Sequence, residues 1–227
     1  MDEHYFKSLK EGREYFIKGD FEKARRIFME LRKGFPHRTE AYIGEGNVLE
    51  RQGKFREAIQ LYEEALIIAK RSCSNQCCSD ALVSRGRAKI LLSINEKGAP
   101  DEESVKSALR DFDEAIALSP NDYWPYSEKA ILLLSLKRFD EAWPVFEKAI
   151  ERNVNDLETY LRAGICLGCI VENEKNLEQF QRVNKLYRAI ALLSMGFSEE
   201  LSPNQLEDYR KWRKYLMVSL NEILGKY

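Results

Sequence analysis

Small and bulky apolar residues recur four positions apart along the chain, which places both on one face of an α-helix. The pairs are Ala24/Phe28, Ala58/Tyr62, Ala108/Phe112 and Ala142/Phe146. A small residue lets two helices approach closely, and the bulky residue fills the space beside it. Each pair therefore predicts the packed face of a helix, and the pattern as a whole predicts an all-α protein.

The same pattern returns at a fixed interval of 34 residues. Gly19, Phe21, Ala24 and Phe28 recur as Gly53, Phe55, Ala58 and Tyr62, and Ala108, Phe112 and Ala115 recur as Ala142, Phe146 and Ala149. This period, with glycine, alanine, aromatic and proline residues at these offsets, resembles the tetratricopeptide repeat. The resemblance implies helical hairpins that stack into a right-handed superhelix. It also implies a concave groove, lined by the first helix of each hairpin, that holds a segment of a partner.

The repeat predicts about five hairpins followed by a single helix. We expect an array over residues 1–195, with hairpins at about 3–35, 38–71, 79–119, 121–152 and 155–195, the last of them degenerate. Residues 196–227 are expected to form a capping helix packed on the array. Its start is indicated by Ser202-Pro203-Asn204-Gln205, a capping box with proline at the first helical position. Apolar residues then follow at helical spacing from Leu206 to Ile223.

Two insertions break the strict period. Six extra residues fall near 72–79, before the third hairpin, and ten fall near 94–104, inside it. Insertions in stacked repeats lie in loops or lengthen helices, commonly on a functional face. Both interpretations stay open: a longer helix pair with a solvated loop, or a functional loop.

Composition narrows the class of protein. The 36 Lys and Arg residues balance 37 Asp and Glu residues, so the net charge of −1 gives no overall attraction to nucleic acid or anionic lipid. A hydrophobic fraction of 44% excludes a disordered chain. No apolar run approaches the ~18–20 residues that a membrane span needs, and the first residues lack the pattern of a secretory signal. Five unevenly placed cysteines indicate reduced thiols. A cytoplasmic protein is expected.

Candidate chemistry is sparse. His4 and His37 lie in no pattern that indicates a catalytic pair, and no phosphate-binding loop is present. Cys166 and Cys169 have the spacing of a zinc half-site, and Cys73, Cys77 and Cys78 could supply the other half. The alternative is that these cysteines are packing or loop thiols. We favour that alternative and expect no metal, no cofactor and no enzymatic activity.

A basic run near the end of the chain, Arg210-Lys211-Trp212-Arg213-Lys214, interleaves an aromatic residue in the way that nucleic-acid binders do. The alternative is the solvated face of the last helix, opposite its apolar stripe. On a chain that is otherwise neutral, the solvated face is the favoured interpretation, and no nucleic-acid partner is expected.

Helical spacing nominates residues for the groove that the resemblance implies. Arginines would bind carboxylates, Asn47 would hold backbone amides, and Trp124 would offer an apolar anchor. The alternative is that several of them are merely exposed polar residues. The principal candidates are Arg13, Asn47, Arg51, Arg87, Trp124, Glu128 and Arg162, with Ile17, Glu50, Ser84, Ser127 and Ile131 on the same predicted face.

One known use of the repeat can be tested against the sequence. Co-chaperones that grip the C-terminal carboxylate of heat-shock chaperones place Lys and Asn, then Asn, then Lys and Arg on three successive first helices. The corresponding positions here hold Leu9 and Arg13, Gly44, then Asp80 and Ser84, and moving the window by one hairpin matches only Asn47. We do not expect a heat-shock chaperone tail as the partner.

The resemblance thus predicts a non-catalytic interaction module or adaptor that binds a protein or peptide segment in its groove. Two alternatives stay open. One is a regulator that responds to a short signalling peptide or small molecule. The other is an assembly chaperone that holds a subunit of a complex before its incorporation.

Overall fold

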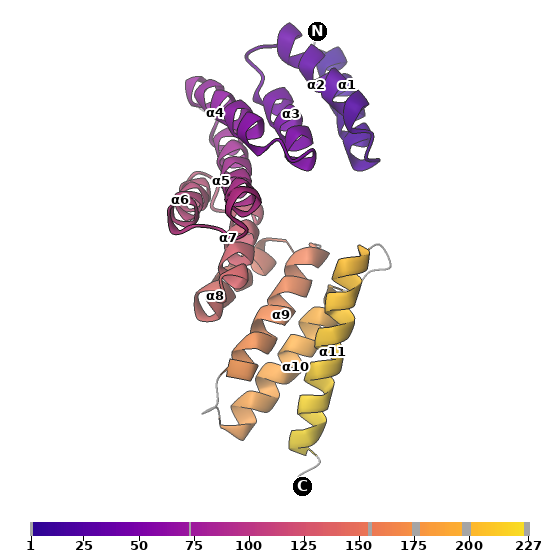
Figure 1. Ribbon diagram of the computed structural model, residues 1–227, viewed down its shortest axis with the longest axis vertical. Coiled ribbons are helices and arrows are strands. Elements are labelled where there is room, and N and C mark those ends of the chain that lie inside the picture. Colours follow the sequence, from indigo (N-terminus) through magenta and orange to yellow (C-terminus); the bar gives the residue numbers. More distant parts are fainter. Residues whose placement is uncertain (1, 73, 154–155, 174–177, 197–200, 225–227) are drawn as a thin grey trace. The chain divides into compact units, whose positions relative to one another are not determined.

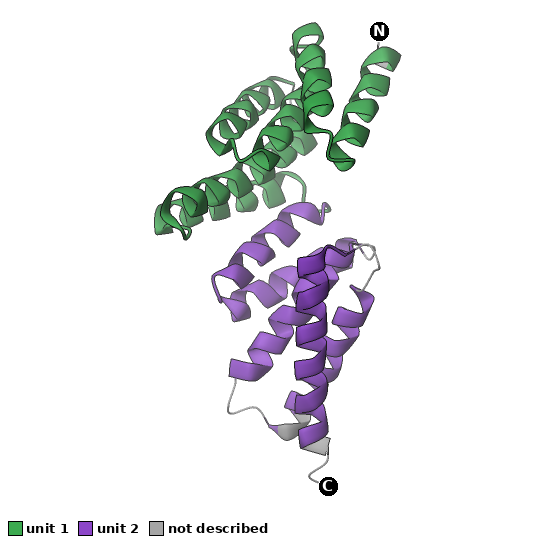
Figure 2. Cartoon of the chain, turned by 45° about the vertical axis from the view of Figure 1, so that its right-hand side comes forward, with its two compact units in different colours: residues 1–121 green, residues 122–227 purple. Residues whose placement is uncertain are grey.

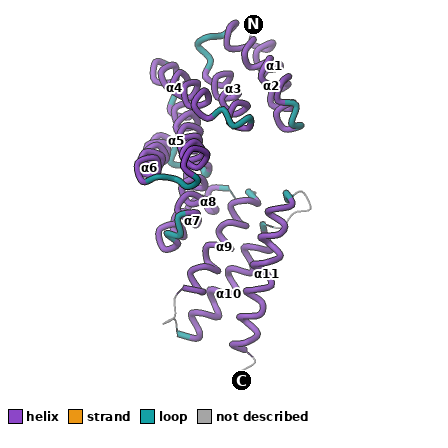
Figure 3. The backbone as a smooth tube through the Cα atoms, in the orientation of Figure 1, coloured by secondary structure: helices purple, strands orange, loops and turns teal. Residues whose placement is uncertain are grey.

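The computed structural model describes residues 2–72, 74–153, 156–173, 178–196 and 201–224, which form eleven α-helices and no strand (Figures 1 and 3). The all-α prediction is confirmed. No helix among these residues is long and apolar enough to cross a membrane. The helices are α1 (Asp2–Ile17), α2 (Phe21–Gly34), α3 (Thr39–Arg51), α4 (Phe55–Arg71), α5 (Asn75–Lys97), α6 (Glu102–Leu118), α7 (Trp124–Ser135), α8 (Phe139–Arg152), α9 (Leu157–Asn173), α10 (Gln179–Met195) and α11 (Pro203–Leu224).

The chain forms two compact units, residues 1–121 and residues 122–227 (Figure 2). The first unit contains the hairpins α1–α2, α3–α4 and α5–α6, and the second contains α7–α8, α9–α10 and the single helix α11. The boundary between the units follows the third hairpin, whereas the predicted boundary between array and cap lies at residue 195. Within the second unit, α11 packs against α9 and α10.

A glycine in the left-handed conformation closes the turn inside the first two hairpins. Gly19 has φ 79° and Gly53 has φ 76°. In each turn the next residue donates its backbone N–H to a carbonyl group five residues earlier, as Asp20 does to Tyr15 over 2.9 Å. This is the Schellman motif, which needs a left-handed residue just after the helix. The fourth hairpin makes the same turn with Lys137, at φ 58°.

The predicted pairing of small and bulky residues forms the core of each hairpin. Phe28, Tyr62, Phe112 and Phe146 are each at most 1% exposed. A β-carbon built on Gly46 of α3 would lie 2.5 Å from the ring of Tyr62 on α4. Only a residue without a side chain lets the two helices approach this closely. The glycine period along the sequence is therefore a packing requirement.

The two insertions mostly lengthen helices. Ser74 caps α5 by accepting a hydrogen bond from the backbone N–H of Cys77, so the segment predicted as a loop at 72–79 is helical from Asn75 onward. The loop predicted near 94–104 is reduced to residues 98–101, because α5 runs to Lys97 and Asp101 caps α6. The third hairpin is therefore a longer helix pair with a short loop.

The capping box at the start of α11 forms as the sequence predicts. The backbone N–H of Ser202 donates to the side chain of Gln205 over 2.9 Å, and the N–H of Gln205 donates back to Ser202. Leu216 and Leu220 of the predicted apolar stripe are buried. The side chain of Ile223 lies outside the described residues.

Candidate functional site

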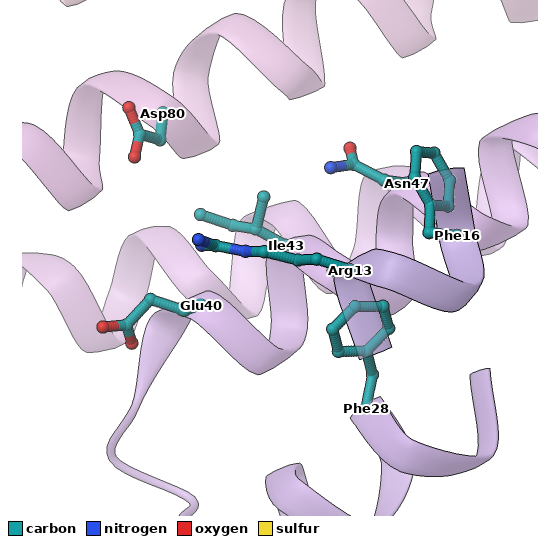
Figure 4. A pocket seen from close by; sticks show the side chains of 8 residues that line it. Arg13, Phe16, Phe28, Glu40, Ile43, Asn47 and Asp80 are labelled. Carbon is teal, nitrogen blue, oxygen red and sulfur yellow. The ribbon is translucent and has the colours of Figure 1, made fainter. Parts of the chain in front are cut away.

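A small hollow in the first unit is lined by the first helices of all three of its hairpins. Its volume is about 90 Å³, well below the ~300–1,000 Å³ of typical small-molecule pockets. Figure 4 shows its lining side chains, which come from α1, α2, α3 and α5. They are Arg13 and Phe16 of α1, Phe28 of α2, Glu40, Ile43 and Asn47 of α3, and Asp80 of α5. Gly44 of α3 also lines the hollow.

The floor of the hollow is the ring of Phe28, which is 1% exposed. A β-carbon on Gly44 would lie 2.6 Å from this ring, so any side chain there would displace it. Gly12 meets the same ring from α1, with a built β-carbon 2.8 Å away. The two glycines let α1 and α3 close over Phe28 and leave a concave surface above it.

Arg13 is an exposed cation at this hollow. Among the described residues it makes no hydrogen bond and no ion pair. Figure 4 shows its side chain extending between the carboxylates of Glu40 and Asp80, which lie on opposite sides of it. Glu40 accepts a hydrogen bond from Tyr5 over 3.2 Å, and Asp80 accepts one from Gln76 over 2.9 Å. The hollow thus presents one positive and two negative groups above an apolar floor.

Asn47 belongs to a hydrogen-bond network that runs from the hollow into the core. The hydroxyl group of buried Tyr62 donates to Oδ1 of Asn47 over 2.8 Å and lies 3.5 Å from Glu50. Arg87 donates to both carboxylate oxygens of Glu50, over 3.0 and 3.4 Å. Burial, and then the charge of Glu50, raise the pKa of Tyr62 far above its usual value. Tyr62 therefore stays a neutral donor, and the network is a fixed arrangement.

This network corrects the role expected of Arg87. Its charge is neutralised by Glu50, whose side chain is 8% exposed. Removing Arg87 would leave a nearly buried carboxylate without this partner, so the residue has a packing reason to be an arginine. The sequence could not reveal the pair, because its members lie 37 positions apart on α3 and α5.

Comparison with known proteins identifies the repeat in the first unit. Residues 9–72, which span most of the first two hairpins, match the family model described as tetratricopeptide repeat. Residues 9–72 are a tetratricopeptide-repeat segment.

Solved structures extend the likeness in fold over the whole chain. A thermophilic tetratricopeptide-repeat protein of Thermus thermophilus is 16% identical with a TM-score of 0.67, over 94% of this chain and 99% of that one. PilF of Pseudomonas aeruginosa is 16% identical with a TM-score of 0.65, over 100% and 94%. MamA of Desulfovibrio magneticus is 14% identical with a TM-score of 0.52, over 87% and 97%. At these identities the likeness concerns the fold alone.

In the second unit, Trp124 and Glu128 lie one helical turn apart on α7. The indole N–H of Trp124 donates to the carboxylate of Glu128 over 3.2 Å, and both side chains are half-buried. Arg162 on α9 lies 3.5 Å from Glu158 and 3.8 Å from Asp208 of α11. Since α11 contributes this carboxylate, Arg162 is engaged within the fold.

The remaining predicted groove residues fall into three groups, of which the half-buried Ile131 is one. Arg51 and Ile17 are exposed at the ends of α3 and α1, with 81% of Ile17 accessible. Ser84 and Ser127 are buried, so the predicted helical phase was wrong for these two positions. The hydroxyl groups of Ser127 and Thr159 lie 2.7 Å apart and join α7 to α9. Serine is small enough for a helix contact, which is why spacing alone does not separate the two roles.

The cysteines are thiols within helices or near their starts. Burial raises the pKa of Cys166 to about 12 and that of Cys169 to about 11. Both therefore stay protonated at neutral pH, and the reactive thiolate is scarce. No group of three or more His, Cys, Asp or Glu side chains in the described part of the chain could hold a metal ion. Cys73, a candidate ligand in the second half of the possible zinc site, lies outside the described residues.

Sequence reasoning missed the other residues that line the hollow with Arg13 and Asn47. Ile43 precedes Asn47 by four residues, and Asp80 precedes Ser84 by four, so both lie on the predicted groove face. Asp80 also stands at a position of the carboxylate-binding pattern, where it is a mismatch. Phe16 gave no signal, because an aromatic residue on a helix is equally typical of a core.

Proposed function

We propose that the protein is a non-catalytic interaction module, and that its first unit binds an extended segment of a partner protein at the hollow lined by α1, α3 and α5. The proposal rests on one observation above all. Arg13 stands exposed beside an apolar floor and makes no hydrogen bond or ion pair with another described residue.

The chemistry of the hollow suits a peptide backbone. Arg13 can donate to carbonyl oxygens or a carboxylate of the bound segment. Glu40 and Asp80 can accept from its amides or from a basic side chain. Ile43 and Phe16 offer apolar contact above Phe28. Each of these groups is provided by a different turn of a rigid helix, which limits the ordering cost of binding.

The size of the hollow favours a side chain of a partner over a free small molecule. A cavity of about 90 Å³ holds one apolar side chain, whereas a drug-sized ligand would remain largely in solvent. This supports an adaptor, or an assembly chaperone that holds a subunit, over a regulator that responds to a small molecule. Cys77, Cys166 and Cys169 form no disulfide with another described residue, which supports the cytoplasmic location that we propose.

Affinity capture from native extract tests the proposal. The double variant Arg13→Ala/Ile43→Ala should fold normally, since Arg13 is exposed and Ile43 is only half-buried. It should bind the captured partner about 10-fold or more weakly than the wild-type protein, a loss typical of two contact residues.

A matched control variant is available on the second helices of the same unit. Arg110 on α6 and Ile67 on α4 are exposed, and Ile67 is 53% accessible. Arg110→Ala/Ile67→Ala makes the same chemical change away from the hollow and should leave capture intact. Loss of the partner by this control, with retention by the hollow variant, would disprove the proposed site.

A further inference from the structure

Four cations stand together on the outer face of α11. Arg210, Lys211, Arg213 and Lys214 are all exposed, and none makes a hydrogen bond or ion pair with another residue that the structure describes. Other arginines of the same unit do pair, as Arg188 does with Glu147 over 2.7 Å. On a chain with a net charge of −1, this is a local excess of positive charge.

Apolar side chains continue the same face. Met217 is 37% exposed and Val218 is 48% exposed, one helical turn beyond Lys214. Both line a shallow groove along α11 together with Arg210, Arg213 and Lys214. The stripe from Arg210 to Val218 extends over about 12 Å of helix, a little more than two turns. It is a surface with a cationic half and an apolar half.

The position of α11 in the fold leaves this face uncovered. In each hairpin the first helix packs against a second helix that follows it. Helix α11 follows α10 in the place of a further first helix, and it contacts α9 and α10 through its buried face. No other helix in the described part of the chain contacts it. The outer face is thus available for a helix from elsewhere.

The charges and the aromatic residue together select the kind of partner. Trp212 would have to expose its ring to stack on a nucleotide base. Instead its ring edge meets Gly168 of α9, where a built β-carbon would lie 3.1 Å away, and it packs edge-on against Tyr215. Two exposed apolar side chains are too few to hold a membrane surface. A partner helix that carries carboxylates beside an apolar side matches this face. The carboxylates match its cations, and the apolar side matches its exposed apolar side chains.

We propose that the outer face of α11 binds an acidic amphipathic helix of a partner protein. Carboxylates of that helix pair with Arg210, Arg213 and Lys214, and its apolar residues cover Met217 and Val218. The partner helix then takes the place that a second helix has in each hairpin. This site lies in the second unit and is independent of the hollow in the first.

A selection with random peptides tests the proposal. A phage-displayed library of random 16-residue peptides is first depleted on the charge-reversed variant Arg210→Glu/Lys214→Glu and then selected on the wild-type full chain. The selected peptides should be at least about 10-fold enriched in sequences with three or more Asp or Glu residues at helical spacing beside an apolar stripe. No such enrichment would overturn the proposal.

Fluorescence anisotropy with one labelled selected peptide then locates the site. Arg210→Glu/Lys214→Glu and Met217→Ser/Val218→Ser should each weaken binding about 10-fold or more. Lys70→Glu/Arg71→Glu, the same charge change at two exposed cations of α4, should leave it unchanged. Equal weakening by the α4 control would overturn the proposal.

Two further probes separate the proposed partner from other acidic surfaces. A 20-nucleotide single-stranded RNA and vesicles of phosphatidylserine and phosphatidylcholine are titrated under the same conditions. Both should bind more weakly than the peptide. Tighter binding of either probe, lost in the Arg210→Glu/Lys214→Glu variant, would assign the face to nucleic acid or to a membrane and overturn the proposal.

Discussion

The hydroxyl group of Tyr62 on α4 donates a hydrogen bond to Oδ1 of Asn47 on α3, over 2.8 Å. The tyrosine is fully buried, whereas Asn47 lines the hollow of the first unit. The bond therefore links the packed core of the second hairpin to a residue of the proposed binding surface. It fixes the orientation of the amide group, so that its NH₂ group stays directed away from Tyr62.

Replacing Tyr62 by Phe should destabilise the protein by ~0.5–1.5 kcal/mol. The ring still fills the space beside Gly46, but Asn47 loses its buried donor. Urea unfolding measures the change. Tyr187→Phe, at a tyrosine that is 53% exposed, is the matched control and should be neutral within error. Equal effects of the two variants would show that the Tyr62 hydrogen bond contributes nothing.

Arg87→Ala should destabilise the protein by ~1–3 kcal/mol, because Glu50 is left nearly buried without this cation. Spacing alone predicts the opposite, a variant that folds like the wild-type protein. Arg56→Ala breaks an exposed ion pair with Glu96 and should cost less than about 1 kcal/mol. Adding Glu50→Gln to Arg87→Ala should recover part of the loss in a double-mutant cycle. An Arg87→Ala variant as stable as Arg56→Ala would contradict the network.

Lys137→Gly should stabilise the second unit by ~0.5–1 kcal/mol. Lys137 has φ 58° in the turn of the fourth hairpin, where the first two hairpins use glycine. The reverse change, Gly53→Lys, places a side chain in the same left-handed conformation and should destabilise by a similar amount. Thermal unfolding followed by circular dichroism measures both. A lower melting temperature for Lys137→Gly would contradict this prediction. It would mean that the lysine side chain stabilises the protein by more than the left-handed backbone conformation destabilises it.

The thiols of Cys166 and Cys169 should react slowly with a disulfide reagent at pH 8 in the native protein and rapidly in urea. Burial raises both pKa values, so the reactive thiolate is scarce in the folded state. Cys77, at the start of α5 and only half-buried, should react first. Labelling followed by peptide mass spectrometry assigns the order. Native labelling of Cys166 ahead of Cys77 would contradict it.

The same pKa shifts predict lower stability in alkali. The pKa of the Cys166 thiol is raised from its ordinary value near 9 to about 12. At a pH between these two values, the native state keeps a proton on Cys166 that the unfolded state releases. Stability from this group is therefore complete below pH 9 and falls as the pH rises. Raised pKa values of Tyr5 and Tyr62 act in the same direction at higher pH. Urea unfolding at pH 8 and pH 11 should show a smaller decrease for Cys166→Ala than for the wild-type protein.

Local sequence determines most of the fold, and long-range contacts determine most of the candidate site. The glycine, alanine and aromatic period predicts the hairpins because each interval reflects one close approach, such as Gly46 on Tyr62. Ser74 and Asp101 show where such reasoning fails. Each caps a helix that the interrupted period had hidden, and a cap is a single-residue signal.

Side-chain partners could not be inferred in the same way. The sequence places Arg13 and Arg87 on the same predicted face. In the structure Arg87 pairs with Glu50, whereas Arg13 forms no ion pair with a described residue. That difference depends on which carboxylate lies across the groove, and helical spacing does not specify it. Burial is a second example: Ser84 is buried and Arg51 is exposed, although both lie on the predicted groove face. Their burial depends on packing with other helices, which helical spacing does not specify.

Photo-crosslinking tests the central claim most directly. A benzophenone amino acid is placed at Ile43 inside the hollow or at Arg110 on α6, and each protein is irradiated in native extract. The account predicts a crosslink from position 43 to a segment of a partner protein, competed by unlabelled wild-type protein, and none from position 110. A partner that crosslinks from position 110 and never from position 43 would contradict it.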